Sequence, residues 1–256
     1  MPIVVWRFAL LEVEIVRVLL DNYNYIIYSL ENGNALIIDT TTDTQPLINR
    51  IDKLNIKPLY ILNTHHHYDH TGGNDKIKKK YGCQIVNNIA NQKYIAGIDI
   101  IAEDLFVFEG FNIKFINTPG HAFGHIMFYI SDFKWLFSGD ILFSAGCGRV
   151  FEGSVSELFC SMQNIKSLPE DTKVFFGHEY TIKNVDFALQ YDSGNRDLLD
   201  YKNLLMPNLI TAPSTLRLEK KINPFFRCDK IFIRNSLGVN DEFKAFKKLR
   251  ALRNVF

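Results

Sequence analysis

The chain has 256 residues, a hydrophobic share of 47%, a charged share of 22% and a formal net charge of +1. These are the values of an ordinary globular protein, and the near-neutral charge excludes bulk attraction to nucleic acid or to a membrane surface. This length suits one large domain, or one domain with an appendage.

The first quarter of the chain predicts strands followed by a helix. The apolar start, residues 1–20, is interrupted by charges, so it predicts strand and neither a spanning helix nor a secretory signal. Within it EVEIVRVLL alternates as a half-buried strand does, and YNYIIYSL and NALIIDT follow, joined by a hairpin signal at Asn32-Gly33. DTQPLINRIDKLNI predicts an amphipathic helix with Pro46 in its first turn and one apolar face: Leu47, Ile48, Ile51 and Leu54.

Four later strands each end at a candidate ligand. PLYILN leads into THHHYDH at residues 64–70, and a helix is expected from about Asn74. FNIKFINT, FKWLFSG and TKVFFG lead in turn to His121, Asp140 and His178; in the first of these strands, Phe111, Ile113 and Phe115 share one face. Loops at strand ends are where a rigid sheet usually carries its site.

The pattern changes after residue 180. TIKNVDFALQY and NRDLLDYKNLLM have helical spacing, ITAPSTLRLEKKINPFF predicts an extended, proline-containing link, and DEFKAFKKLRALRNVF predicts a basic helix. We therefore expect an αβ metal-binding domain over residues 1–180 and a mostly helical domain over residues 181–256.

The crowded histidines of residues 64–70 indicate a metal site. Neighbouring imidazoles repel one another once protonated, whereas a cation binds deprotonated imidazole and carboxylate together. In an extended loop His65 and His67 point the same way. Asp69 and His70 lie beyond the next turn, which favours a second site a few ångströms away over one ion that collects all four side chains.

Each site then needs a ligand from a distant strand end. We assign His65, His67 and His121 to one ion. We assign Asp69, His70 and His178 to the other, and place the two oxygens of Asp140 between them. Room for an open position on each ion is typical of a catalytic site, and these donors suit Zn(II), Fe or Mn. His66 and His125 stay outside the ligand set, where they orient ligands.

The motifs THHHYDHTGGN, TPGHAFGH, FSGDILF and FFGHEYT, in this order, resemble the metallo-β-lactamase superfamily. GCGRVFEG, NPFFR and the C-terminal helices narrow the resemblance to the glyoxalase II (hydroxyacylglutathione hydrolase) family over nearly the whole chain. That family implies a four-layer αββα sandwich of the α/β class with a two-metal site, and a helical C-terminal domain that helps to hold glutathione. All seven of its ligand positions are matched here.

The resemblance also implies five contacts to the glutathione moiety: Arg149, Phe151, Tyr180, Arg250 and Arg253. Tyr180 matches the family directly and Arg250 matches a basic position. Arg149 and Arg253 stand where lysine is common and keep the charge. Phe151 stands where tyrosine is common, so we expect one polar contact to be missing.

The implied reaction is hydrolysis of S-D-lactoylglutathione, and of other S-2-hydroxyacylglutathiones, in the second step of methylglyoxal detoxification. A hydroxide that bridges two divalent ions, held by Asp140 and Asp69, would attack the thioester. Zn(II) is the expected metal, with Fe or Mn as alternatives. The expected partner is the small thioester, with neither nucleic acid nor membrane, and the expected state is a monomer. Because the cysteines form no C-x-x-C pair, reduced thiols and a cytoplasmic location are expected.

Four alternatives remain from the sequence. A hydrolase with Cys147 as nucleophile lacks a histidine dedicated to activating it. A sulfur dioxygenase with one iron, acting on glutathione persulfide, would not need the complete second set of ligands. A β-lactamase would not need the glutathione-type tail. A metal-binding protein that has lost turnover is the alternative from another class, and the open coordination positions argue against it.

Overall fold

A computed structural model describes residues 10–256, so the strand expected over residues 1–9 lies outside the described part. The first sheet runs in chain order: β1 (Leu11–Val18), β2 (Asn22–Ser29), β3 (Asn34–Ile38), β4 (Lys57–Leu62), β5 (Gln84–Asn87) and β6 (Ile100–Ile101). Its first three strands are antiparallel, as the hairpin signal predicts, and pairing is parallel from β3 onward.

The second sheet faces the first. Its strand order is β14 (Ser214–Thr215), β13 (Lys173–Phe176), β10 (Trp135–Gly139), β9 (Ile126–Ile130), β8 (Phe111–Asn117) and β7 (Leu105–Phe108). A small hairpin of β11 (Leu142–Phe143) and β12 (Gly146–Cys147) follows β10. In β8 the predicted alternation is confirmed, because Phe111, Ile113 and Phe115 are buried while Asn112 and Lys114 are exposed.

Helices cover the outer sides of the two sheets. On the first sheet, α1 (Gln45–Leu54) and α3 (Asn74–Tyr81) bury Leu47, Ile48, Ile51 and Ile77 against β1 to β5. Beside the second sheet, α4 (Val155–Lys166) begins at a capping box of Ser154 and Glu157 and buries Leu158, Met162 and Ile165. The main core lies between the sheets, so the molecule is the expected four-layer αββα sandwich.

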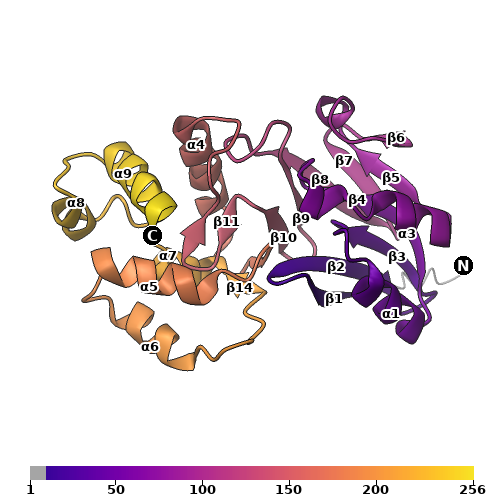
Figure 1. Cartoon of the computed structure of the whole chain (residues 1–256), viewed down its shortest axis with the longest axis horizontal. Helices are drawn as coiled ribbons and strands as arrows, with labels where there is room; N and C mark the ends of the chain where they lie inside the picture. The colour runs from indigo at the N-terminus through magenta and orange to yellow at the C-terminus, as the bar shows by residue number, and fades with distance from the viewer. Residues whose placement is uncertain (1–9) are drawn as a thin grey trace, which may run out of the picture.

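The helices after residue 180 gather at the end of the molecule away from the first sheet (Figure 1). They are α5 (Thr181–Tyr191), α6 (Arg196–Leu204), α7 (Leu216–Ile222), α8 (Ile231–Leu237) and α9 (Glu242–Val255). Within residues 10–256 no helix combines the length and the apolar character needed to cross a bilayer.

The prediction of an extended link over residues 210–226 is wrong. This segment forms β14, which pairs with β13, and then α7. Thr215 caps the helix by accepting the N–H of Leu218, and Leu216, Glu219 and Ile222 are buried at helical spacing. The cap and the buried face therefore outweigh the flanking prolines.

Candidate metal centre and adjoining cavity

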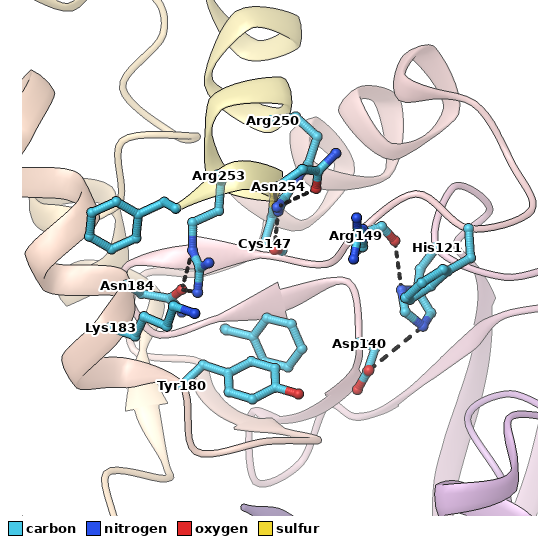
Figure 2. A pocket seen from close by; sticks show the side chains of 13 residues that line it. His121, Asp140, Cys147, Arg149, Tyr180, Lys183, Asn184, Arg250, Arg253 and Asn254 are labelled. Atoms are coloured by element: carbon cyan, nitrogen blue, oxygen red, sulfur yellow. Dashed lines mark hydrogen bonds and ion pairs between the residues drawn. The ribbon is translucent and has the colours of Figure 1, made fainter.

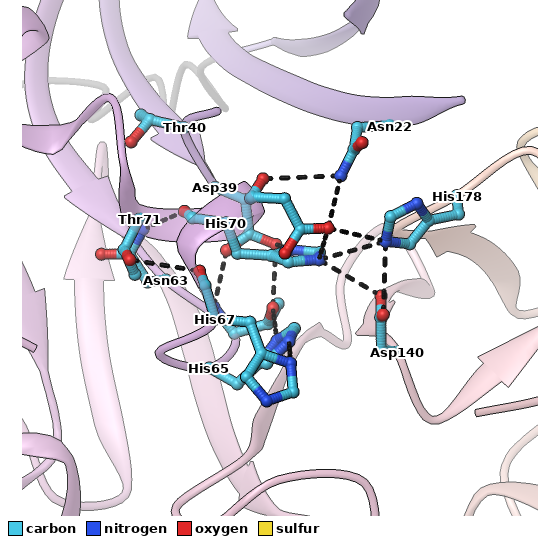
Figure 3. Close-up of polar contacts among 12 residues, drawn as sticks. Asn22, Asp39, Thr40, Asn63, His65, His67, His70, Thr71, Asp140 and His178 are labelled. Atoms are coloured by element: carbon cyan, nitrogen blue, oxygen red, sulfur yellow. Dashed lines mark hydrogen bonds and ion pairs between the residues drawn. The ribbon is translucent and has the colours of Figure 1, made fainter. Parts of the chain in front are cut away.

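The ligands predicted from four strand ends meet at one edge of the sandwich. Figure 3 shows five of them, His65, His67, His70, Asp140 and His178. His65 and His67 follow β4, and the short helix α2 (Tyr68–Thr71) carries Asp69 and His70. His121, Asp140 and His178 follow β8, β10 and β13, which run in the same direction within the second sheet.

Backbone contacts fasten the two sheets together beside the centre. The N–H of Tyr23 donates to the carbonyl of Gly177 at 2.8 Å, and the N–H of Glu179 donates to that of Asp21 at 2.7 Å. A Cβ at Gly177 would lie 2.3 Å from Asp140 Oδ1, so only glycine allows this close approach.

The donor atoms form the two predicted groups of three. In the first, His67 Nδ1 lies 3.0 Å from His65 Nε2 and 3.2 Å from His121 Nε2. In the second, His178 Nε2 lies 3.3 Å from His70 Nε2 and 3.4 Å from Asp69 Oδ2. Such clustering of nitrogen and oxygen donors suits a divalent transition metal.

Asp140 lies between the two groups. Its Oδ2 is 3.6 Å from His121 Nε2 in the first group and 3.3 Å from His178 Nε2 in the second. Its Oδ1 is buried and has no hydrogen-bond partner in the described part of the chain. The same oxygen lies 3.5 Å from His70 Nε2. A buried carboxylate oxygen that accepts no hydrogen bond is costly unless a cation compensates for it, so the residues fit a metal centre.

Electrostatics in the centre follow from the same crowding. Burial lowers the pKa of His121 to about 4 and places the pKa of His65 well below its usual value, so both rings are neutral and able to ligate at pH 7. Burial also disfavours a charged His178, but Asp140, Asp21 and Asp69 outweigh it and raise the pKa of His178 well above its usual value. The carboxylates thus draw positive charge into the second group.

Each ligand histidine has one ring nitrogen toward the centre and the other held outside it. The outer contacts are His65 Nδ1 with Thr64 Oγ1 (3.1 Å), His67 Nε2 with Glu152 Oε1 (3.4 Å), His70 Nδ1 with Asp39 Oδ2 (2.8 Å), His121 Nδ1 with the Arg149 carbonyl (2.7 Å) and His178 Nδ1 with Asp21 Oδ1 (2.9 Å). Asp69 is likewise held, because its Oδ2 accepts from Asn22 Nδ2 at 3.0 Å. Such outer contacts fix ring orientation and tautomer.

Sequence reasoning missed these supporting residues, apart from Arg149, which it proposed for another role. Asp39 follows β3 just as Asp140 follows β10, so the strand-end pattern could have found it. Asp21 and Glu152 carry no such signal, since they reach histidines 157 and 85 residues away in the chain.

The two histidines predicted to stay outside the ligand set lie next to it. His125 accepts the backbone N–H of Asp140 at 3.2 Å and stacks on His65 with ring centroids 5.0 Å apart. His66 Nε2 lies 3.1 Å from Glu152 Oε1. His66, His67 and Glu152 form a further cluster of potential ligand atoms within 4.8 Å of one another. The sequence did not predict this cluster.

A cavity of about 350 Å³ opens from the metal centre toward the C-terminal helices (Figure 2). His121 and Asp140 line it at one end. It is also lined by all five residues predicted to contact glutathione: Arg149, Phe151, Tyr180, Arg250 and Arg253. Lys183, Asn184 and Phe143 line it too and were not predicted. The cavity therefore joins a metal centre to a wall that carries four cationic side chains.

Two of the predicted contacts lie directly beside the ligands. Tyr180 stacks on His178 with ring centroids 4.8 Å apart and planes 6° apart, and its hydroxyl points toward Asp140 (Figure 2). Burial raises the pKa of Tyr180 to about 12, so this hydroxyl is a neutral donor. Phe151 is 60% exposed and meets the rings of His67 and His121 edge-on at 5.6 and 5.3 Å.

The two arginines of α9 differ in how their guanidinium groups are used. Arg250 is only 5% exposed, and its Nη1 donates to the carbonyls of Cys147 at 2.7 Å and Gly148 at 3.1 Å. Arg253 donates to the side-chain oxygen of Asn184. Both arginines line the cavity, but Arg250 also supports the turn that follows β12 through these two hydrogen bonds, whereas Arg253 is held by Asn184.

Facing sheets, helices on both outer sides and histidine–aspartate groups at strand ends define a protein of the metallo-β-lactamase type. The metallo-beta-lactamase superfamily model matches residues 19–178, and the hydroxyacylglutathione hydrolase C-terminus model matches residues 179–256. The chain belongs to the hydroxyacylglutathione hydrolase family of this superfamily, and its site binds divalent metal.

Relatives named hydroxyacylglutathione hydrolase match almost end to end. The protein of Pelagibacter ubique is 40% identical over 254 residues, covering 96% of this chain and all of its own length. That of Rhodospirillum rubrum is 37% identical over 254 residues, covering 96% of this chain and 99% of its own. These matches span both the metal centre and the C-terminal helices.

Solved structures with the same fold include enzymes with other names. The BLEG-1 B3 metallo-beta-lactamase has a TM-score of 0.67 at 23% identity, over 84% of this chain and 99% of its own. ETHE1 from Myxococcus xanthus has a TM-score of 0.63 at 19% identity, over 96% of this chain and 99% of its own. At these identities the likeness establishes the fold alone.

Proposed function

We propose that the protein hydrolyses S-D-lactoylglutathione, and other S-2-hydroxyacylglutathiones, to the hydroxy acid and glutathione, as in methylglyoxal detoxification. The observation that carries this proposal is the single cavity that joins the metal-centre residues His121 and Asp140 to a cationic wall. The names of relatives that match nearly the whole chain support the same substrate.

The proposed cofactor is a pair of divalent ions per chain, with Zn(II) as first choice and Fe or Mn as alternatives. One ion would be held by His65, His67 and His121, and the other by Asp69, His70 and His178, with Asp140 between them. When bound, such ions supply hydroxide at neutral pH and polarise the thioester carbonyl.

The chain's own groups then hold and orient the reactants. Asp140 and Asp69 lie beside the position that the attacking hydroxide would take, and one of the two carboxylates would accept its single hydrogen bond, which would leave a lone pair directed at the thioester carbon. The pKa of both carboxyls lies below the usual range, because His178 and His70 outweigh burial, so both are ionised acceptors at pH 7. The Tyr180 hydroxyl is a neutral donor in the cavity wall that points toward Asp140, and it is suited to the acyl oxygen.

The glutathione moiety carries two carboxylates and one ammonium, so it is complementary to a cationic wall. Arg149, Arg253 and Lys183 supply that charge at the cavity. Arg250 also lines the cavity, but its Nη1 already donates to two backbone carbonyls, so its main part is to hold the wall in place. Phe151 packs edge-on against two ligand histidines and offers an apolar surface in place of a hydroxyl.

We further propose that the chain acts as a cytoplasmic monomer with a catalytic domain over residues 1–180 and a substrate-binding domain over residues 181–256. Lys183, Asn184 and Arg253 come from the second of these. All four cysteines lie in the described part of the chain and are free thiols. Light scattering coupled to gel filtration tests the monomer.

The decisive experiment combines two measurements on one preparation. Metal content per chain and the loss of S-D-lactoylglutathione absorbance are recorded before and after a chelator. We expect two ions per chain and hydrolysis that the chelator stops and added Zn(II) restores. Oxygen uptake with glutathione persulfide in place of hydrolysis would instead assign a dioxygenase, and metal without either activity would assign a binding protein.

A further inference from the structure

Glu152 is a carboxylate at the metal centre that lies outside the two groups of ligands. It belongs to the loop before α4, where the N–H groups of Phe151 and Glu152 donate to the His121 carbonyl at 3.1 and 3.4 Å. Its Oε2 accepts the backbone N–H of Phe123 at 2.8 Å. The loop is thus fastened to a proposed ligand, His121, and to the residue two positions after it.

The other oxygen of Glu152 meets two imidazoles. Oε1 lies 3.1 Å from His66 Nε2 and 3.4 Å from His67 Nε2. An ionised carboxylate only accepts hydrogen bonds, so each ring must present an N–H at Nε2. A neutral His67 then keeps its lone pair on Nδ1, the atom that faces His65 and His121. Glu152 therefore selects the tautomer of His67 that is able to ligate.

His67 depends on this contact more than its neighbours depend on theirs. Its side chain is 25% exposed, compared with 1% for His70 and 5% for His178, so packing restrains its ring least. The adjacent His66 is held by the same oxygen and by stacking on Tyr94, with centroids 4.8 Å apart and planes 21° apart. One carboxylate thus anchors two consecutive residues of the ligand loop.

We propose that Glu152 is a positioning residue that fixes the tautomer and orientation of His67 for the first metal ion. This inference rests on the ligand set proposed above. Removing an outer contact of this kind typically lowers metal affinity by roughly 10–100-fold. The loss is confined to the ion held by His65, His67 and His121, because Glu152 contacts no member of the other group.

The test uses metal-free full-length protein and Zn(II) titrated against a chromophoric chelator, with ring signals followed by long-range ¹H–¹⁵N NMR. Glu152→Ala is expected to weaken Zn(II) binding roughly 10–100-fold at His67 and His121 and to leave binding at His70 and His178 unchanged. Glu152→Gln keeps an accepting oxygen and is expected to restore part of the affinity. Asp21→Asn is the matched variant, because it changes the outer contact of His178. It is expected to weaken Zn(II) binding at His70 and His178 and to leave binding at His67 and His121 unchanged.

The NMR signature separates positioning from a general structural role. Metal-free wild type is expected to show His67 as the Nε2–H tautomer, and Glu152→Ala as a mixture of both. Unchanged affinity and tautomer in Glu152→Ala, or equal weakening at both sites together with a lower melting temperature, would overturn the inference. Wild type that binds no Zn(II) would reject the ligand set, while the tautomer in metal-free protein would still decide the role of Glu152.

Discussion

At the cavity wall, Asn184 on α5 is hydrogen-bonded to Arg253 on α9. The Oδ1 of Asn184 accepts hydrogen bonds from Arg253 Nε at 3.2 Å and from Arg253 Nη2 at 3.0 Å. Asn184 is itself held, because its Nδ2 donates to the Ser144 carbonyl at 3.0 Å. Arg253 Nη1 has no partner within residues 10–256. The guanidinium is therefore oriented before substrate arrives, with one nitrogen free to bind an anion.

Arg253→Ala should weaken substrate binding without impairing chemistry. Loss of one charge-assisted hydrogen bond to a carboxylate is worth about 1.5 kcal/mol, so KM for S-D-lactoylglutathione should rise roughly tenfold while kcat changes little. Steady-state kinetics measure both constants. Lys247→Ala is the matched control, because it removes the same charge from an exposed position on α9 that does not line the cavity. An equal rise in KM in both variants would point to long-range electrostatics.

Arg250→Ala should act on stability first. It removes a buried donor from the carbonyls of Cys147 and Gly148, which should lower the free energy of unfolding by about 2–4 kcal/mol. Urea unfolding of the metal-loaded protein measures this. Arg250→Lys should recover part of the loss, since one ammonium can still reach a carbonyl. A variant of wild-type stability with a tenfold higher KM would return Arg250 to direct contact with substrate.

Asp140→Ala should remove bound metal and turnover together. The substitution deletes the one carboxylate that contacts histidines of both groups, and the clustered imidazoles lose the charge that offsets a cation. Metal analysis after gel filtration and the thioester assay give the two readings. Asp132→Ala, in an exposed turn before β10, should keep both. Full turnover by metal-free Asp140→Ala would refute the hydrolytic scheme.

The reactivity of the thiols should show that Cys147 is not the catalytic nucleophile. Burial raises the pKa of Cys147 despite nearby Arg250 and Arg253, and burial raises that of Cys83 to about 11. At pH 8 an aromatic disulfide reagent should therefore react rapidly with exposed Cys160 alone, and with all four thiols in urea. Cys147→Ala should keep its turnover. Loss of turnover in a folded, metal-loaded Cys147→Ala would restore the cysteine mechanism.

Particular residues mark what the sequence could and could not predict. The seven proposed metal ligands were predictable because strand-end patterns place them in four separate motifs. The hydrogen-bond partners of Arg250 were not predictable. Its positive charge is visible in the sequence, but its burial against Cys147 is a tertiary contact between residues 103 positions apart. Helix α7 was missed although Thr215 and the Leu216–Glu219–Ile222 spacing indicate it, since the flanking prolines were given more weight.

The last prediction concerns pH and a buried acid that ties α7 to the hairpin of β11 and β12. Glu219 is fully buried and accepts the N–H of Ala145, the amide of Asn223 and the hydroxyls of Ser144 and Ser214. Burial outweighs these hydrogen bonds and raises the pKa of Glu219 above its usual value. The folded state therefore binds this proton more tightly than the unfolded chain does.

The stability that this proton provides is complete below the unfolded pKa of about 4.3 and is lost as pH rises through the folded value. Glu219→Gln resembles the protonated form and lacks this titration. The free energy of unfolding of wild type minus that of Glu219→Gln should accordingly fall as pH rises from about 4.3 through the folded pKa of Glu219, measured by urea unfolding of metal-loaded protein. Glu103→Gln, at an exposed position, should show no such trend. A difference that grows with pH would mean that the hydrogen bonds to the carboxylate outweigh its burial.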